Sequence, residues 1–301
     1  MLARLLSAIE RGDDDGHQVA RLTATGTPTA RTVGITGAPG AGKSTLTNAL
    51  VAVARTRGER VAVLAIDPSS PFTGGAILGD RVRMSQHALD DGVFIRSMAT
   101  RGHLGGLALA TPEAVRLLDA VGFDWVLVET VGVGQVEVAV ASAADTTVVV
   151  VNPAWGDAVQ ANKAGLMEVA DVFVVNKADR PGADQTGHDL ETLLDLTGRT
   201  GAEGAWRPPV IATTATTGGG AEALWDTIGA HHAHLTDTGR LQQRRRGRRR
   251  AELALVVEQR LRSRADELLG AAEAESLADA VGDGDLDPWS AADHIVGPLG
   301  A

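Results

Sequence analysis

Short apolar runs rich in β-branched residues alternate with helix-like stretches along most of this chain. The apolar runs occupy residues 32–36, 61–66, 93–97, 125–130, 146–151, 172–176 and 209–213. Most are apolar on both faces, which is typical of strands covered by helices on both sides. Helices are expected near 43–57, 79–90, 106–121, 157–169, 186–197 and 219–233. The alternation predicts an α/β fold with a mostly parallel sheet and a ligand site at the carboxyl ends of its strands.

A glycine-rich loop lies between the first apolar run and the first helix-like stretch. Gly37, Gly42, Lys43 and Ser44 match the pattern G-x-x-x-x-G-K-[ST] in the strand-loop-helix context that the motif requires. In such a loop the backbone amides and the helix start hold phosphate oxygens, the lysine reaches the β- and γ-phosphates, and the serine supplies a magnesium ligand. The sequence therefore predicts a P-loop NTPase whose phosphate-binding residues are Gly37, Ala38, Pro39, Gly40, Ala41, Gly42, Lys43, Ser44 and Thr45.

The tetrapeptide NKAD follows the apolar run that ends near residue 176, where a base could be recognised. The carboxylate of Asp179 can accept hydrogen bonds from N1–H and N2–H2 of guanine, whereas adenine offers neither donor. Asn176 can address the base edge, and Lys177 can lie along the face of the base. The alternative is an ordinary helix start after a strand. Together with the phosphate loop the motif favours GTP over ATP, and the backbone of Thr214 and Ala215 is expected to complete the pocket.

Acidic residues at the carboxyl ends of two apolar runs, and one further along the chain, are candidates for metal binding and γ-phosphate sensing. The pattern Glu129-x-x-Gly132 is similar to the GTPase motif D-x-x-G, with the acid facing magnesium through water and the glycine amide meeting the γ-phosphate. Asp67 and Asp80 are further candidates for binding metal or orienting water, although either alone could be a cap or turn residue. The predicted catalytic residues are Lys43, Asp67, Asp80 and Glu129, and the predicted magnesium ligands are Ser44, Asp67, Asp80 and Glu129.

Composition excludes several other classes of protein. A net charge of −10 disfavours a nucleic-acid or membrane binder, because both need a positive surface. The absence of cysteine excludes disulfides, thiolate metal sites and cysteine nucleophiles. No stretch approaches the ~20 apolar residues that span a bilayer. We therefore expect a cytoplasmic protein with neither a nucleic-acid nor a membrane partner.

The pattern changes after about residue 235, where strand signals stop. One long amphipathic helix is predicted from the helical spacing of Leu253, Val257, Leu261, Ala265 and Leu268. Ser290 and Asp293 resemble a capping box for a short last helix. The predicted organisation is a short helical segment over 1–30, a P-loop domain over 31–235 and a helical region over 236–301.

Two clusters of charged or titratable residues lie near the start of the C-terminal region. Seven arginines fall between Arg240 and Arg250, and they could form an RNA- or acid-binding patch. A solvated or dimer-facing helix surface, with arginine pairing to acids across a two-fold axis, is the favoured interpretation. His231, His232 and His234 are expected near the end of a surface helix, and a metal site there is disfavoured because no carboxylate or cysteine lies at ligand spacing.

The longer motifs resemble one family closely. The segments AIDPSSPFTGGAILGDRVRM, GVFIRSMATRGHLGGLA, VETVGVGQVEVAVA, GDAVQANKAG and NKADRPGAD are similar to those of the MeaB/ArgK-type GTPase chaperones of adenosylcobalamin-dependent acyl-CoA mutases, the methylmalonic aciduria type A protein family. The resemblance runs from about residue 30 to the end of the chain. It implies a GTPase domain that uses GTP, GDP and Mg2+, a C-terminal arm that forms a homodimer, and a mutase as partner.

The resemblance also implies roles for single residues. Asp67, Asp80 and Glu129 fall in switch positions around magnesium and the γ-phosphate, and Asp157 and Lys163 fall on a third switch that senses the partner. The expected function is a GTP-hydrolysing metallochaperone-type switch, slow by itself and stimulated by its mutase, that assists cobalamin loading, protection and reactivation. The alternative is a P-loop small-molecule kinase of a transport system, which needs an acceptor pocket and a base that we do not locate in the sequence.

Overall fold

A computed structural model of the chain describes residues 1–67, 87, 89–99, 104–130, 143–153, 167–196 and 204–297. It contains two compact units, Met1–Arg248 and Arg249–Ala301. Helix α10 (Arg240–Leu269) begins in the first unit and continues in the second. Among the described helices, none is both long enough and apolar enough to cross a membrane.

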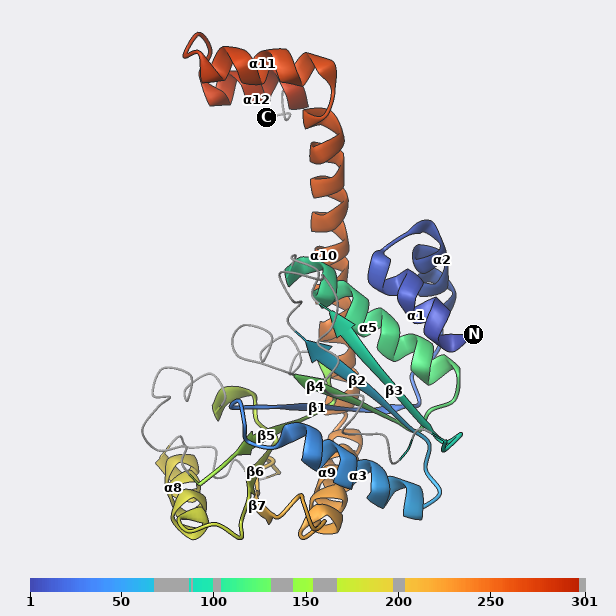
Figure 1. Cartoon of the computed structure of the whole chain (residues 1–301), viewed down its shortest axis with the longest axis vertical. Helices are drawn as coiled ribbons and strands as arrows, with labels where there is room; N and C mark the ends of the chain where they lie inside the picture. Colours follow the sequence, from blue (N-terminus) through green and yellow to red (C-terminus); the bar gives the residue numbers. More distant parts are fainter. Residues whose placement is uncertain are drawn as a thin grey trace. The chain divides into compact units, whose positions relative to one another are not determined.

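The first unit is built on a seven-stranded parallel sheet (Figure 1), as the sequence predicts. The strands are β1 (Arg31–Gly37), β2 (Val61–Asp67), β3 (Val93–Ala99), β4 (Trp125–Thr130), β5 (Thr146–Val151), β6 (Val172–Asn176) and β7 (Val210–Thr213). Their order across the sheet is β3-β2-β4-β1-β5-β6-β7. Because β1 lies between β4 and β5, the strand order reverses there, and such a reversal opens a ligand crevice at the carboxyl ends of the strands.

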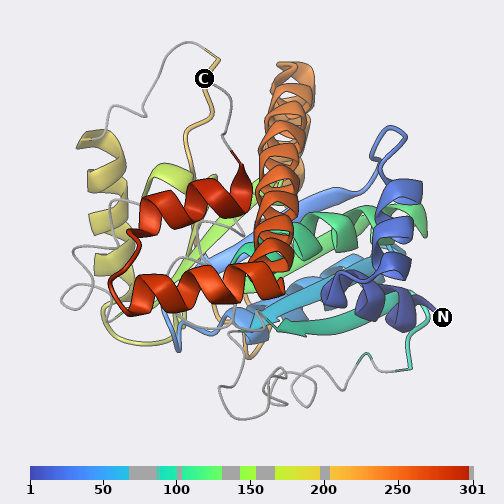
Figure 2. The same ribbon diagram turned by 90° about the horizontal axis from the view of Figure 1, so that it is seen from above.

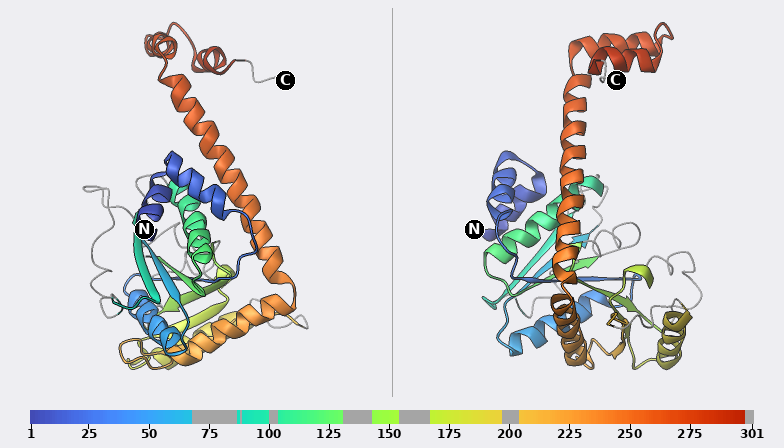
Figure 3. Two further views of the ribbon diagram at one scale, coloured as in Figure 1. Left: turned by 90° about the vertical axis from the view of Figure 1, so that its right-hand side faces the viewer. Right: turned by 180° about the vertical axis from the view of Figure 1, so that it is seen from behind.

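Helices cover both faces of this sheet. The helices of the first unit are α1 (Leu2–Arg11), α2 (Asp14–Thr23), α3 (Lys43–Thr56), α5 (Leu104–Ala120), α8 (Ala183–Leu196) and α9 (Ala221–Asp237), followed by the start of α10. Helices α3 and α9 pack on one face, where Leu50 and Ile228 meet Val148 and Val150 in one core cluster. Helices α1 and α5 cover the other face over β2 and β4, and α8 covers it over β5 and β6. Figure 3 shows α5 and α3 on opposite sides of the sheet.

An N-terminal helical hairpin of α1 and α2 packs beside the edge strand β3. Leu6 and Ile9 of α1 are fully buried in the cluster that α5 forms with the sheet. Arg96 of β3 donates hydrogen bonds to the Ser7 hydroxyl at 2.9 Å and to Glu10 Oε2 at 2.8 Å. These contacts attach the hairpin to the sheet edge farthest from β7.

The second unit is helical. It contains most of α10, followed by α11 (Ala272–Gly282) and α12 (Pro288–Val296), which lie side by side (Figure 2). The predicted cap of the last helix is wrong. Asp287 is the N-cap and accepts hydrogen bonds from the amides of Trp289 and Ser290, both at 3.0 Å. Pro288 explains the shift, because proline is favoured in the first turn and the residue before it is held extended.

The arginine cluster and the histidines also depart from expectation. Arg245 and Arg248 form ion pairs with the buried Asp145 of their own chain, so for these two a solvated or dimer-facing role is wrong. Arg244 pairs with the buried Asp171, although its side chain stays 41% exposed. His231 is fully buried on the side of α9 that faces the sheet, so it is not exposed to solvent as expected for a surface helix. Both departures arise because the last turns of α9 and the first turns of α10 pack against the amino ends of the strands. Of the expected helices, most of 79–90 and 157–166 lies outside the described residues.

Candidate active site

The phosphate loop follows β1 at the reversal in strand order. Gly37 has φ 136°, and a Cβ there would stand 2.0 Å from the carbonyl oxygen of Val150. Gly42 has φ 92°, and a Cβ there would stand 2.4 Å from Nδ2 of Asn176. Both positions require glycine, because an L side chain meets backbone strain as well as a close neighbour. The loop can therefore wrap tightly only with glycine at these two positions.

Helix α3 begins at Lys43, directly after the loop. Its N-cap residue is Gly42, which has no side chain to cap the first amides. Lys43 is buried, and its Nζ donates to the carbonyl oxygens of Gly37 at 2.7 Å and Ala38 at 3.1 Å. These bonds place a positive charge at the mouth of the loop, beside the positive end of the helix dipole. The arrangement suits a chain of phosphates.

Ser44 and Glu129 meet across the crevice. The Ser44 hydroxyl donates to Oε1 of Glu129 at 2.5 Å, although the two residues are far apart in the sequence. Glu129 lies near the end of β4 and its side chain is buried. A hydroxyl and a carboxylate are hard oxygen ligands, which magnesium prefers. The residues present here therefore fit a magnesium ion.

The other acids predicted for this site are only partly covered. Asp67 is the last residue of β2, and β2 pairs with β4 so that Ala65 lies beside Glu129. The side chain of Asp67 lies outside the described part of the structure. Asp80, Gly132, Asp157 and Lys163 also lie outside the described residues.

The NKAD segment, the predicted base-recognition loop, is hydrogen-bonded directly to the phosphate loop. Asn176, at the end of β6, donates from Nδ2 to the carbonyl oxygen of Ala41 at 2.8 Å. Its Oδ1 accepts from the amide of Ala215 and from the hydroxyl of Thr213, both at 3.1 Å. One buried side chain thus joins the phosphate loop, β6 and the segment after β7.

Lys177 adds a second link between the two loops. Its Nζ donates to the carbonyl oxygen of Gly40 at 2.6 Å. Its φ of 61° makes it the one non-glycine residue with positive φ in the described part of the chain. Backbone strain of this kind in a non-glycine residue is characteristic of functional sites. Asp179, two residues further on, is exposed to solvent.

The segment after β7 forms a closed turn beside Asn176. The amide of Thr214 donates to the carbonyl oxygen of Gly219 at 2.8 Å, and the amide of Ala215 points to Asn176. The structure therefore brings together three predicted segments, around Lys43, Asn176 and Ala215, at the carboxyl ends of the strands.

One pair near the site escaped the sequence analysis. The hydroxyl of Thr130, at the end of β4, lies 3.3 Å from that of Thr36, which precedes the phosphate loop, and both residues are buried. Two threonines at the ends of apolar strands are the only sequence signal for this contact, and pairing them requires the strand order.

The comparison with family models decides the assignment. The model described as "Methylmalonyl Co-A mutase-associated GTPase MeaB" matches residues 2–268. This chain belongs to the MeaB family of GTPases. The resemblance in the sequence motifs is thereby confirmed, and a guanine-nucleotide site is what the family implies.

Relatives agree with this assignment. A Pyrococcus abyssi protein named "Putative GTPase" is 50% identical over 98% of this chain and 91% of its own length. The GTPase ArgK of Escherichia coli is 43% identical over 70% of this chain and 64% of its own length. A crystal structure described as that of a LAO/AO transport system kinase is 27% identical, has a TM-score of 0.63, and covers 98% of this chain and 96% of that one. Since the relatives with higher identity are named GTPases, the kinase alternative is not favoured.

Proposed function

We propose that this protein is a GTP-dependent switch that assists cobalamin loading, protection and reactivation of an adenosylcobalamin-dependent acyl-CoA mutase, either methylmalonyl-CoA mutase or a similar enzyme. The observation that carries the proposal is the double attachment of the base loop to the phosphate loop, through Asn176 to Ala41 and through Lys177 to Gly40. It supports one nucleotide spanning both loops. The mutase comes from the name of the family.

The nucleotide would be held mainly by backbone groups. The residues from Gly37 to Thr45 would hold the phosphates, with Lys43 near the β- and γ-phosphates. Asp179 would accept from the guanine edge, beside the turn of Thr214 and Ala215. The solvent exposure of Asp179 is consistent with this role, because its carboxylate is open to an incoming base.

Ser44 and Glu129 would hold the magnesium ion, with Asp67 and Asp80 as further acids of the switch regions. When bound, the ion neutralises negative charge on the phosphates during transfer to water. Gly132 would meet the γ-phosphate through its amide. Hydrolysis would then reset a protein that binds its partner differently in the GTP and GDP states.

Partner contacts are proposed at two places. Asp157 and Lys163 belong to the third switch of the family, which would sense the mutase. On α10, Leu253, Val257 and Leu261 are exposed at a spacing of four residues, which supports a homodimer formed through this helix. We place the protein in the cytoplasm.

The decisive experiment measures GTP hydrolysis by the purified protein, alone and with each cobalamin-dependent acyl-CoA mutase of the host, with ATP as the control nucleotide. We expect slow turnover of GTP, none of ATP, and stimulation by one mutase. Equal rates with and without every mutase would contradict the chaperone role. Transfer of phosphate to an added amino acid instead of water would support the kinase.

A substitution at Asp179 tests the base assignment separately. Asp179→Asn replaces one acceptor oxygen by a donor, which matches xanthine better than guanine. We expect weaker GTP binding, roughly 10-fold or more, and a gain for xanthosine triphosphate. The matched control Asp184→Asn, at an exposed position of α8, should leave both affinities unchanged.

A further inference from the structure

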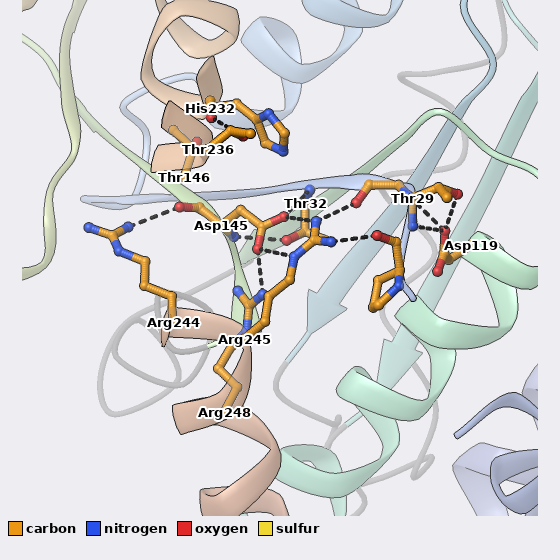
Figure 4. A network of polar contacts seen from close by, with 12 residues as sticks. Thr29, Thr32, Asp119, Asp145, Thr146, His232, Thr236, Arg244, Arg245 and Arg248 are labelled. Carbon is orange, nitrogen blue, oxygen red and sulfur yellow. Dashed lines mark hydrogen bonds and ion pairs between the residues drawn. The ribbon is translucent and has the colours of Figure 1, made fainter. Parts of the chain in front are cut away.

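A cluster of ion pairs around two buried aspartates lies at the amino ends of the strands, and Figure 4 shows its part around Asp145. The nucleotide site lies at the opposite ends of the strands. Asp145 and Asp171 directly precede β5 and β6. Arg244, Arg245 and Arg248, from the first turns of α10, form ion pairs with these two carboxylates. We call these five residues the arginine clamp.

Arg245 is at the centre of the clamp. Its Nε and Nη2 donate to the two carboxylate oxygens of Asp145 at 3.1 and 2.6 Å. Its Nη1 and Nη2 also donate to the carbonyl oxygens of Pro28 at 2.6 Å and Ala30 at 2.8 Å. Pro28 and Ala30 belong to the linker between the N-terminal hairpin and β1. Asp119 of α5 also holds this linker, because it accepts from the amide of Ala30 at 2.7 Å. Arg245 therefore joins α10, the entry to β5 and the segment that leads from the N-terminal hairpin into β1.

Arg244 joins the two aspartates. It donates to both carboxylate oxygens of Asp171, at 2.9 and 2.8 Å, and to the main-chain oxygen of Asp145 at 2.9 Å. Arg248 pairs with the Asp145 carboxylate from the next turn of α10. Bidentate pairing of this kind fixes orientation as well as distance. The first two turns of α10 are therefore held in one position against the strands.

Three neighbouring strands, β1, β5 and β6, start at the clamp, and two of them lead to segments of the nucleotide site. Asp145 accepts from the amide of Thr32 in β1 at 3.3 Å, and its own amide donates to the Thr32 hydroxyl at 2.8 Å. Asp171 accepts from the amide of Thr147 in β5 at 2.9 Å. From these points β1 leads to the phosphate loop, and β6 leads to Asn176.

A second series of contacts reaches the clamp through α9. Helix α9 packs against α3, which begins at the phosphate loop, and Arg57 and Asp226 pair between them at 2.7 Å. Further along α9, Nδ1 of His231 lies 2.8 Å from the hydroxyl of Thr146. Its Nε2 lies 3.3 Å from Oδ1 of Asp171. Two continuous routes thus connect the phosphate loop with the same buried aspartates.

A buried ion cluster is an inefficient means of stabilising a fold, because desolvation of the charges offsets much of their attraction. Its best-attested use is to specify one arrangement over others. The clamp joins the strands of the nucleotide site, the linker from the N-terminal hairpin and the base of α10. These are the parts that a switch protein would have to coordinate.

We propose that the arginine clamp couples the nucleotide state to the first two turns of α10, so that GTP and GDP favour different arrangements of the clamp. The proposal rests on the proposed GTP switch and adds the residues through which the nucleotide state reaches α10. Coupling between two sites is reciprocal. If the nucleotide changes the clamp, a change in the clamp must alter the ratio of the affinities for GTP and GDP.

The test uses the full chain and two nucleotides, GDP and a non-hydrolysable GTP analogue. Arg244→Lys keeps the charge but loses the bidentate fork, and Arg244 is 41% exposed, so the fold should tolerate it. We expect the affinity ratio of the two nucleotides to change by about fivefold or more. Arg264→Lys, in the exposed pair with Glu267 further along α10 and outside both routes, is the matched control and should leave the ratio unchanged.

Hydrogen exchange on the wild-type protein provides the second measurement, which does not depend on any variant. Amides of residues 28–32 and 240–248 should exchange at different rates with GDP and with the GTP analogue. Identical exchange in the two states, or an unchanged ratio in a folded Arg244→Lys protein, would overturn the coupling and make the clamp a static support. Wild-type protein that binds neither nucleotide would overturn the GTP switch and the coupling together.

Discussion

The two ends of the same parallel strands are organised by different groups. At the carboxyl ends, the described contacts of Lys43, Asn176 and Lys177 include main-chain oxygens of the phosphate loop. At the amino ends, long arginine side chains hold two buried carboxylates. Backbone groups in tight turns form a surface that can receive a ligand, whereas paired side-chain charges satisfy one another. The sheet thus separates an end built for binding from an end built for fixing elements together.

The largest expected effect concerns the clamp. Arg245→Ala should lower the free energy of unfolding by about 3–5 kcal/mol, because Arg245 is 10% exposed and its loss leaves the fully buried Asp145 with one arginine fewer. Arg57→Ala should cost much less, because that pair is largely exposed and solvent screens its attraction. Urea unfolding of both variants measures the difference. Equal losses would mean that the amino ends of the strands are not fixed by buried charge.

The pH dependence of stability should come from His231. Burial lowers the pKa of His231 to about 4, although the Asp171 carboxylate acts in the opposite direction. Burial likewise lowers the pKa of its neighbour His232. The unfolded chain therefore takes up protons first as the pH falls. The stability due to neutral His231 is complete above pH 6.5 and decreases by up to ~3 kcal/mol between pH 6.5 and 4.

Unfolding curves at several pH values, with His231→Gln and His188→Gln as a matched pair, test this origin. His188 is exposed on α8. His231→Gln should reduce the slope of stability between pH 6.5 and 4, and His188→Gln should preserve it.

For Asp145, burial raises the carboxyl pKa, but hydrogen bonds and charges of Arg245 and Arg248 outweigh burial and hold it at about 2. The stability due to this aspartate is therefore lost only as the pH falls from about 4 towards 2.

At the carboxyl ends the corresponding change is Gly42→Ala. A Cβ would meet Nδ2 of Asn176 in a backbone conformation that disfavours L residues, so the link between the two loops should break. We expect nucleotide affinity to fall on the order of 100-fold, which is ~2.7 kcal/mol. Gly58→Ala is the control, because Gly58 also has positive φ but no atom lies near its Cβ position. Titration with GDP should show a loss for Gly42→Ala alone.

The smallest effect concerns Lys177. Both Lys177→Ala and Lys177→Gly remove the hydrogen bond to Gly40, but only glycine relieves the strain at φ 61°. The alanine variant should therefore be less stable than the glycine variant by about 1 kcal/mol. Thermal unfolding of the two proteins in parallel measures this difference. The reverse order of stability would show that the side chain, and not the backbone, sets the shape of the loop.

Much of the architecture could be predicted because its signals are local. The seven strands could be predicted from apolar runs, and the phosphate loop before Lys43 could be predicted from a motif of eight consecutive residues, 37–44. The clamp could not be predicted, because Arg245 and Pro28 lie 217 positions apart and Arg244 and Asp171 lie 73 apart. A run of arginines has the same local appearance whether it faces solvent, a partner or a buried acid. The cap at Asp287 differs from the predicted one for a local reason, because Pro288 sets the start of the helix directly after Asp287 although Ser290 and Asp293 have the spacing of a capping box.

By itself, the sequence determined the parallel α/β fold, the phosphate loop and the family, because each depends on residue types at short, regular spacing. Only the tertiary structure decided that Asn176 and Lys177 hold the phosphate loop, that Ser44 meets Glu129, and that three arginines of α10 pair with buried aspartates. The physical reason is that buried charges and amides take their partners from whichever strand ends the packing brings near them. That proximity is a property of the whole sheet and its helices.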